Sequence, residues 1–267
     1  LLAPAAKAMR PSGIRKFFDI AAQVKGVLSL SIGEPDFAAP DKVLAAMKAS
    51  LDAKETSYTG NSGMMELREA ISHHFEQRYG VHYDPKDEIL VTVGVSEGLA
   101  MALLAITEPG DEVIIQTPAY NCFFSSVRNS GLVLSENALK LVNGRWEIDF
   151  EDLEERASRE KARALLFCNP QNPTGRVWTR DELTRVAEIC EKHGIFLISD
   201  EIHGELTAEG FRYTPLASVS PWAKDHVITA SAASKAFNIA GLQTAYIIAP
   251  VAEARNRIDR QININEV

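Results

Sequence analysis

Apolar and polar residues follow two different spacings along this chain. Continuous apolar runs with the length of a buried β-strand cover residues 89–93, 113–117, 164–168, 195–199 and 227–230. Between them, apolar residues recur every three or four positions, which is typical of helices with one buried face. Strands that alternate with helices favour parallel pairing. The pattern therefore predicts an α/β fold with a mainly parallel sheet between layers of helices.

Helix boundaries can also be predicted from the sequence. Thr179 and Glu182 have the spacing of a capping box, and Gly194 is placed to end the helix that they begin. Residues 94–98 are predicted to form a tight turn, because a glycine stands at each end of this segment. Further helices are predicted at residues 40–51, 65–79 and 99–106.

The composition argues against several classes of partner. The 267 residues carry a formal net charge of -8 and no basic stripe that could neutralise phosphates, so no nucleic-acid partner is expected. No apolar run reaches the length of a membrane span, so no membrane partner is expected either. Cys122, Cys168 and Cys190 lack the spacing of metal ligands. This favours reduced thiols, no bound metal and a cytoplasmic protein.

One lysine, Lys235, has an unusual setting. It lies in a turn rich in small residues, 231–242, between the apolar runs 227–230 and 245–249. A lysine in a loop is most often a solvated surface residue. A lysine amine can also act as a nucleophile toward a carbonyl group. The residues that follow the other strands decide between these two interpretations.

Polar or aromatic residues follow each of the predicted strands. Ser96, Tyr120, Asn172 and Asp200 follow the first four strands, as Lys235 follows the fifth. Ligands of a parallel sheet bind beyond the carboxyl ends of its strands, so these residues are expected to lie close together. Each residue taken alone also has a purely structural explanation, as the start of a helix, a core aromatic, a turn residue or a helix cap.

Taken together, these residues predict one chemistry. A lysine amine forms an imine with an aldehyde, and a carboxylate keeps a ring nitrogen protonated. An aromatic side chain stacks on the ring, an amide contacts a ring oxygen, and the N-terminus of a helix holds a phosphate. The cofactor that has an aldehyde, such a ring and a phosphate is pyridoxal phosphate.

Several motifs resemble those of a known family. Residues 169–175 have the sequence N-P-Q-N-P-T-G, residues 199–202 S-D-E-I, and residues 234–235 S-K. Residues 31–37 have the sequence S-I-G-E-P-D-F, and residues 58–68 match the pattern Y-T-x3-G-x3-L-R. These motifs match those of the class I/II aminotransferases, the fold-type I pyridoxal-phosphate enzymes. The resemblance covers nearly the whole chain.

The resemblance implies a role for each strand-end residue. Lys235 is expected to be the Schiff-base lysine and to move the proton at the substrate Cα. Asp200 is expected to pair with the protonated ring nitrogen, and Tyr120 to stack on the ring. Asn172 is expected to donate to the phenolic oxygen of the ring, beside the substrate.

The resemblance also implies phosphate and substrate contacts. Val95 and Ser96, through their amides, are expected to hold the cofactor phosphate together with Ser234. Gly33 is expected to lie near the substrate carboxylate. Tyr58 is expected to reach the phosphate in the site of another subunit, which implies a homodimer with shared active sites.

Two positions depart from the usual aminotransferase pattern. His203, among the cofactor-binding positions, stands where a tyrosine is usual, and Gln243 stands where a phosphate-binding arginine is usual. The sequence motifs around both positions resemble those of the MalY/PatB branch, the carbon–sulfur β-lyases. The resemblance implies an aminotransferase that acts on an α-amino acid and a 2-oxo acid, with a β-lyase as the alternative. A remote alternative is a regulatory domain that senses pyridoxal phosphate.

The resemblance predicts three segments. Residues 1–35 are expected to form an N-terminal arm with part of a small domain, and residues 36–255 the large α/β domain that binds the cofactor. Residues 256–267 are expected to begin a connecting helix. The family continues into a C-terminal small-domain segment, expected beyond Val267, which carries the arginine for the substrate carboxylate.

Overall fold

The structure is a computed structural model that describes residues 17, 20–21, 23–28, 33 and 35–264. Its contacts divide the chain into two compact units, Leu1–Ala38 and Ala39–Val267. Most of the N-terminal segment predicted at residues 1–35 lies outside the described residues. All of the elements described below belong to the second unit.

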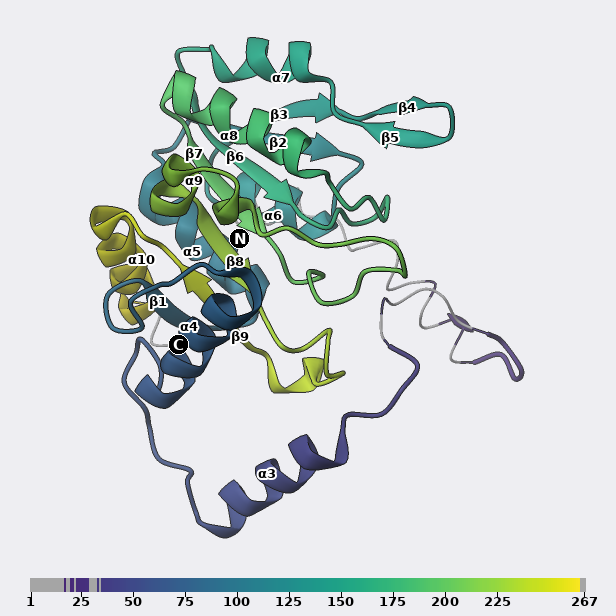
Figure 1. The fold of residues 1–267 in the computed structure, drawn as a ribbon, viewed down its shortest axis with the longest axis vertical. Helices are drawn as coiled ribbons and strands as arrows, with labels where there is room; N and C mark the ends of the chain where they lie inside the picture. The colour runs from purple at the N-terminus through teal and green to yellow at the C-terminus, as the bar shows by residue number, and fades with distance from the viewer. Residues whose placement is uncertain (1–16, 18–19, 22, 29–32, 34, 265–267) are drawn as a thin grey trace, which may run out of the picture. The chain divides into compact units, whose positions relative to one another are not determined.

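A seven-stranded sheet forms the centre of the second unit (Figure 1). Its strands are β1 (Ile89–Val93), β2 (Glu112–Thr117), β3 (Val133–Ala138), β6 (Ala162–Cys168), β7 (Phe196–Asp200), β8 (Ile228–Ser231) and β9 (Thr244–Ile248). The strand order is β1-β9-β8-β7-β6-β2-β3. β9 is antiparallel to both of its neighbours, and the other pairs are parallel. All strands of this sheet except β9 therefore end at the same edge.

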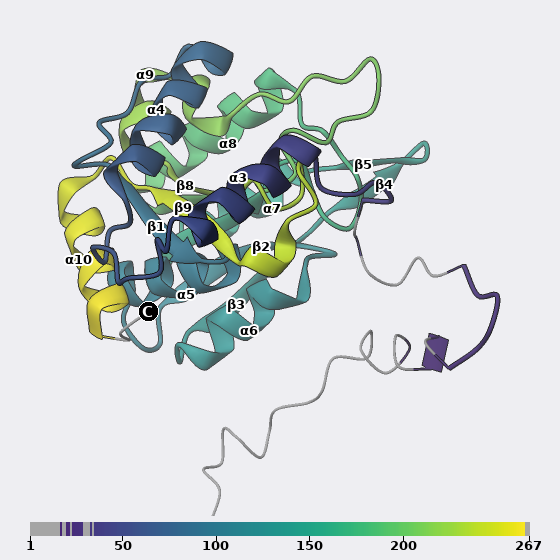
Figure 2. The same ribbon diagram turned by 90° about the horizontal axis from the view of Figure 1, so that it is seen from below.

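Helices cover both faces of this sheet, as Figure 2 shows. Phe75 and Leu183 belong to the buried cluster under one layer of helices, and Leu99, Phe123 and Ile258 to the cluster under the other. The first layer contains α4 (Met65–Tyr79), α7 (Phe150–Ala157), α8 (Arg180–His193) and α9 (Pro221–His226). The second layer contains α5 (Val95–Ile106), α6 (Asn121–Asn129) and α10 (Ala252–Ile264).

The remaining elements are small or peripheral. The helix α3 (Asp41–Asp52) has no buried residue, and β4 (Lys140–Val142) pairs with β5 (Arg145–Glu147) as a separate antiparallel hairpin. Short 3₁₀ turns, η1 and η2, cover Leu216–Ser218 and Ala240–Leu242. Within the described part of the chain, no helix has the length and the apolar composition that a membrane span requires.

The structure confirms the predicted α/β fold with its mainly parallel sheet and corrects two details. Residues 94–98 are not a separate turn before the helix, because the left-handed φ of 84° at Gly94 makes the turn in one residue and α5 begins at Val95. Asp200 is the last residue of its strand and does not follow it. The strand after Lys235, β9, is antiparallel to both of its neighbours, which is consistent with a sheet that is mainly parallel.

The predicted capping box is confirmed. The Thr179 hydroxyl accepts a hydrogen bond from the backbone N–H of Glu182, and the Glu182 carboxylate accepts one from the backbone N–H of Thr179. At the other end of α8, Gly194 has a left-handed φ of 63° and donates to the last carbonyls of the helix. These caps define both ends of α8, which packs against β7.

Candidate active site

The predicted chemistry collects at the carboxyl ends of four consecutive strands. Lys235 follows β8, Asp200 ends β7, Asn172 follows β6 and Tyr120 follows β2. These strands are neighbours in the order β8-β7-β6-β2, and all of their pairs are parallel. The four residues therefore lie along one edge of the sheet, although they span more than a hundred positions in the sequence.

Asp200 is the buried acid of this edge. It lies opposite Cys168 in β6 and opposite Ala230 in β8, and its Oδ1 accepts a hydrogen bond of 3.2 Å from the backbone N–H of Ile202. The pKa of Asp200 is raised to about 7, mainly by burial and also by the negative charge of Glu201, although the hydrogen bond from Ile202 lowers it. A carboxylate in such a setting gains from a cationic partner, such as a protonated ring nitrogen.

The loop after β6 is held by buried polar atoms. The backbone N–H of Asn172 donates to the Cys168 sulfur at 3.4 Å, and the thiol donates to the carbonyl of Pro170. The side-chain amide of Gln171 donates to the carbonyl of Pro118 at 2.7 Å, which joins this loop to the end of β2. These bonds place Asn172 between the ends of β2 and β7.

The sequence patterns missed the contribution of Cys168 to this loop. Burial, and next the charge of Asp200, raises the pKa of its thiol well above the usual range. Cys168 therefore acts as a neutral packing and hydrogen-bonding group beneath Asn172. A cysteine directly before the N-P-x-N-P segment is the only sequence signal that could have indicated it.

The turn after β8 carries the lysine. The backbone N–H of Phe237 donates to the carbonyl of Ala233 at 3.0 Å, and that of Ile239 donates to Ser234 at 3.0 Å. These bonds close the chain around Lys235, whose side chain is half-buried. The backbone that carries Lys235 is therefore a hydrogen-bonded turn and not an open loop.

His203 lies in the loop that leaves Asp200. It is half-buried, and its pKa is lowered first by burial and then by the positive charge of Lys235. The imidazole is therefore neutral at neutral pH and lies within the electrostatic field of the lysine.

The first turn of α5 has free anion-binding capacity in its backbone. Val95 and Ser96 are the first residues of α5, so their amides have no acceptor within the helix, and Gly94 at the N-cap has no side chain that could cap them. A Cβ on Gly98 would lie only 3.0 Å from the side chain of Ile247 in β9. The helix therefore lies close against the strand beside β8, with Ser96 exposed at its beginning.

Tyr120 and the remaining predicted residues are exposed. Tyr120 is the N-cap of α6 and is 46% exposed, so its ring can take a ligand. Tyr58 is fully exposed, and Gln243 is exposed at the end of η2. Gly33 belongs to the N-terminal unit. Within the described residues, no group of His, Cys, Asp or Glu side chains is placed to hold a metal ion.

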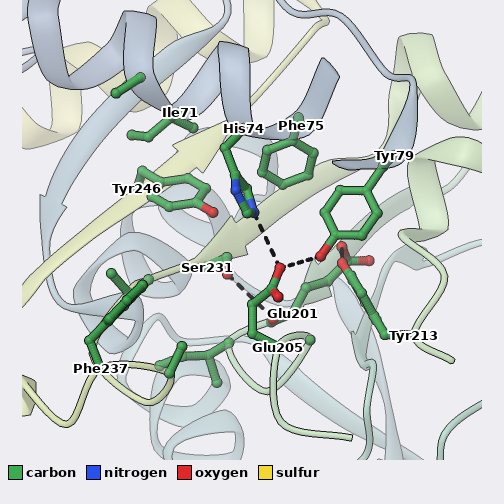
Figure 3. A pocket seen from close by; sticks show the side chains of 16 residues that line it. Ile71, His74, Phe75, Tyr79, Glu201, Glu205, Tyr213, Ser231, Phe237 and Tyr246 are labelled. Carbon is green, nitrogen blue, oxygen red and sulfur yellow. Dashed lines mark hydrogen bonds and ion pairs between the residues drawn. The ribbon is translucent and has the colours of Figure 1, made fainter. Parts of the chain in front are cut away.

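A second residue of the S-D-E-I segment, Glu201, has no role predicted from the sequence. It is 2% exposed and lies in the wall of a cavity of about 320 Å³, which Phe237 of the lysine turn also lines (Figure 3). Phe75, Tyr79 and Tyr246 form apolar walls of the same cavity. Successive strand residues point to opposite faces of a sheet. Two consecutive acids at the end of a buried strand therefore face both helix layers, and this pair is the sequence signal that could have indicated a second buried acid.

Comparison with known proteins agrees with this geometry. A family model described as aminotransferase class I and II matches residues 25–264. YugH of Bacillus subtilis, whose name assigns it to the aminotransferases, is 40% identical over 244 residues, which are 91% of this chain and 62% of YugH. Cystathionine beta-lyase PatB of the same organism is 37% identical over 242 residues, again 91% of this chain and 62% of the relative. The chain thus spans about three fifths of the length of these relatives.

The solved structures agree as well. The crystal structure of cystalysin from Treponema denticola, which contains a pyridoxal 5'-phosphate cofactor, superposes with a TM-score of 0.86 at 32% sequence identity. The match covers 94% of this chain and 63% of cystalysin. On the match of the family model to most of the chain, this protein belongs to the aminotransferase class I and II family.

Proposed function

We propose that this protein is a pyridoxal-phosphate enzyme that acts on α-amino acids and transfers their amino group to a 2-oxo acid. The observation that carries the proposal is the buried acid Asp200, which ends the strand beside the one that leads to Lys235. The description of the family and the name of YugH support transamination as the reaction. The cofactor of cystalysin supports pyridoxal phosphate.

The residues of the site fit this cofactor. Asp200 is buried and has a raised pKa, as expected for an acid whose stable partner is a cation. The N-terminal amides of α5 suit a phosphate, and Tyr120 offers an exposed aromatic face. Pyridoxal phosphate, when bound, supplies an aldehyde for the lysine amine and a ring that withdraws electrons from the substrate Cα.

Each residue then has a part in the reaction. Lys235 binds the cofactor through its amine and moves the proton at the substrate Cα. Asp200 keeps the ring nitrogen protonated, and Asn172 donates to the ring oxygen beside the substrate. His203 lines the same site as a neutral group. We assign ring stacking to Tyr120.

Further contacts complete the proposed site. The amides of Val95 and Ser96, with Ser234, bind the phosphate, and Gly33 lies near the substrate carboxylate. Tyr58 reaches the phosphate of a second subunit, so the enzyme is a homodimer with shared active sites. The full exposure of Tyr58 supports this assignment, because its side chain is available to another chain.

We also propose that residues 36–255 are the cofactor-binding domain and that the protein is cytoplasmic. Residues 1–35 belong to a small domain in this proposal, and residues 256–267 lead toward its C-terminal part. The free thiols of Cys168 and Cys190, both buried, suit a reducing compartment.

Carbon–sulfur β-elimination is the second candidate reaction. PatB is nearly as similar to this chain as YugH is, and His203 and Gln243 are the departures from the aminotransferase pattern. Both reactions begin with removal of the Cα proton by Lys235. They differ afterwards, in whether the amino group is passed on or a thiol leaves from Cβ.

One experiment tests the cofactor and separates the two reactions. Borohydride treatment of the cofactor-loaded protein should fix pyridoxal phosphate on Lys235, which peptide mapping detects; a label on another lysine would contradict the proposal. The loaded enzyme is then incubated with an amino acid panel and a 2-oxo acid, and with cystathionine alone. Formation of a new amino acid supports transamination, whereas release of pyruvate and thiol supports the lyase.

A further inference from the structure

Glu97, in the first turn of α5, bonds back to the strand before the helix. Its Oε2 accepts a hydrogen bond of 2.7 Å from the backbone N–H of Val93, the last residue of β1. A hydrogen bond from an N–H to a carboxylate is shorter and stronger than one between neutral groups. The side chain therefore fastens the start of the helix to the end of the strand, across the turn at Gly94.

The amide of Val93 is available to Glu97 because β1 is an edge strand, with β9 on one of its sides only. Backbone N–H groups two residues apart in a strand point to the same side. The N–H of Val91 points away from β9, because it donates to the carbonyl of Ser62 at 3.0 Å. The N–H of Val93 therefore also points away from β9, and the carboxylate of Glu97 satisfies it.

A second hydrogen bond closes the same turn. The hydroxyl of Thr92 donates to the carbonyl of Gly94 at 3.1 Å. Gly94 has a φ of 84° and a ψ of 156°, a conformation that other residues rarely adopt. An unconstrained glycine samples many conformations, and fixing one of them costs conformational entropy. In the folded chain, Thr92 and Glu97 contribute this constraint.

The turn sets the direction of the amides at the start of α5. The N–H of Val95 belongs to the same peptide unit as the carbonyl of Gly94, so the bond from Thr92 fixes both. The N–H of Ser96 lies in the first turn, which has fewer internal hydrogen bonds than the middle of a helix and frays more easily. Glu97 holds this turn, and with it the amide of Ser96, against the end of β1.

The charge of Glu97 acts against a phosphate at this helix end. Its Oε1 is shielded from solvent and has no hydrogen-bond partner among the residues that the structure describes, and the bond to Oε2 comes from an uncharged amide. No hydrogen-bonded cation therefore neutralises the carboxylate. Like charges repel, so a carboxylate in the first turn disfavours a phosphate at the same end. Any benefit of Glu97 to phosphate binding must come from the position of the amides.

We propose that Glu97 is a positioning residue for the cofactor phosphate, because it holds the amides of Val95 and Ser96 in place before the cofactor binds. This inference rests on the proposed function, since the phosphate is that of pyridoxal phosphate. A site whose donors are already oriented loses less entropy when its ligand binds. Glu97 thus adds affinity for the phosphate and none for the ring.

The test compares two ligands that differ only in the phosphate group. Pyridoxal phosphate and pyridoxal, which lacks the phosphate, are titrated into the apo forms of the wild type, Glu97→Ala and Glu97→Gln. Glu97→Ala should bind pyridoxal phosphate about three- to tenfold more weakly than the wild type, with no change for pyridoxal. Glu97→Gln keeps an oxygen that can accept from Val93 and loses the charge, so it should bind pyridoxal phosphate at least as tightly as the wild type.

Three results would overturn the proposal. The first is an equal loss of affinity for both ligands in Glu97→Ala, which a merely structural role would produce. The second is unchanged binding of pyridoxal phosphate to Glu97→Ala, and the third is a Gln variant as weak as the Ala variant. Because Val93 is 48% exposed, water can replace the lost acceptor, so Glu97→Ala should still fold.

Glu253→Ala is the matched control, because Glu253 is also an acid in the first turn of a helix, α10. It should bind both ligands like the wild type, and a selective loss like that expected for Glu97→Ala would contradict the proposal.

The same titrations distinguish this inference from the function on which it rests. If the wild type binds neither ligand, the proposed cofactor is wrong and the inference fails with it. If the wild type binds pyridoxal phosphate and Glu97→Ala binds it equally well, only the role of Glu97 is wrong. The proposed function then stands.

Discussion

Asp200 and Cys168 lie opposite each other at the ends of two neighbouring parallel strands, β7 and β6. The thiol opposite the acid is buried, and its own pKa is raised, so it stays neutral and provides no cation that could stabilise the ionised form of Asp200. Asp200 therefore holds its proton more tightly in the folded chain than in water. Because this raised pKa is about 7, the protonation of Asp200 can be measured near neutral pH without a bound cofactor.

The first prediction concerns the stability of the cofactor-free protein. The folded-state pKa of Asp200, about 7, exceeds the usual 3.8, so the folded state binds more protons between these values. The contribution of Asp200 to the free energy of unfolding therefore rises as pH falls, by about 2 kcal/mol between pH 8 and pH 5.5. The free energy of unfolding of Asp200→Asn, measured by urea unfolding at both pH values, should not show this increase.

The control for this measurement is Asp225→Asn, which changes an exposed acid of the same type. Its difference in stability between pH 8 and pH 5.5 should equal that of the wild type. If Asp200→Asn also follows the wild type, Asp200 is not the group that titrates in this range, and its burial has no effect on the proton equilibrium.

The second prediction concerns turnover of the same variant. Asp200→Asn should still retain bound cofactor but lose most of its activity, because a neutral amide cannot keep the ring nitrogen protonated. Each tenfold loss in turnover corresponds to about 1.4 kcal/mol of barrier, and a loss of several tenfold steps is expected. Cofactor content from the absorption spectrum and turnover are measured on one sample. Turnover near that of the wild type would refute the assigned role of Asp200.

The third prediction concerns Gly63, which lies against the edge strand β1. Its φ is +87°, and an added Cβ would lie 2.2 Å from a methyl group of Val91. Gly63→Ala should therefore lower the free energy of unfolding by about 2–4 kcal/mol, through backbone strain and overlap. Gly60→Ala is the matched control, because a Cβ there would meet no atom within 4 Å. Equal stability of the two variants would contradict the close approach of Gly63 to β1.

The sheet and the strand-end residues could be predicted because each depends on a short stretch of sequence. The strands that end at Cys168 and Asp200 are continuous apolar runs, and the carboxyl ends of parallel strands always share one edge. The edge strand Val133–Ala138 could not be predicted in this way. Ser135 and Asn137 are its buried polar residues, and outward-facing positions interrupt its apolar pattern.

The setting of Glu201 could not be predicted either. Its burial depends on Tyr213 and on the backbone of Leu216, twelve and fifteen residues further along, which only the folded loop brings to it. The polar helix Asn121–Asn129 also escaped prediction, because it buries few apolar residues, among them Phe123. When distant segments create the environment of a residue, its neighbours in the sequence give little indication of its burial or structure.

The last prediction concerns the position where the family usually has an arginine. Gln243 lies at the end of η2 with a left-handed φ of 51°, and its side chain is exposed. Glutamine offers the phosphate a neutral amide, whereas arginine would offer charge-assisted and bidentate hydrogen bonds. The phosphate must then depend more on the N-terminus of α5 and on Tyr58 of the second subunit in the proposed dimer.

Tyr58→Phe should therefore weaken the binding of pyridoxal phosphate, and Gln243→Arg should partly restore it. Stabilisation of an anion at a helix end contributes about 0.3–2 kcal/mol, so loss of one further contact should raise the dissociation constant by about two- to thirtyfold. The measurement is a titration of the apo forms of wild type, Tyr58→Phe and the double variant. Because Tyr58 is fully exposed, its substitution should leave the fold intact. If Tyr58→Phe binds the cofactor like wild type, Tyr58 is not a phosphate ligand, and the proposal of shared active sites loses its main support.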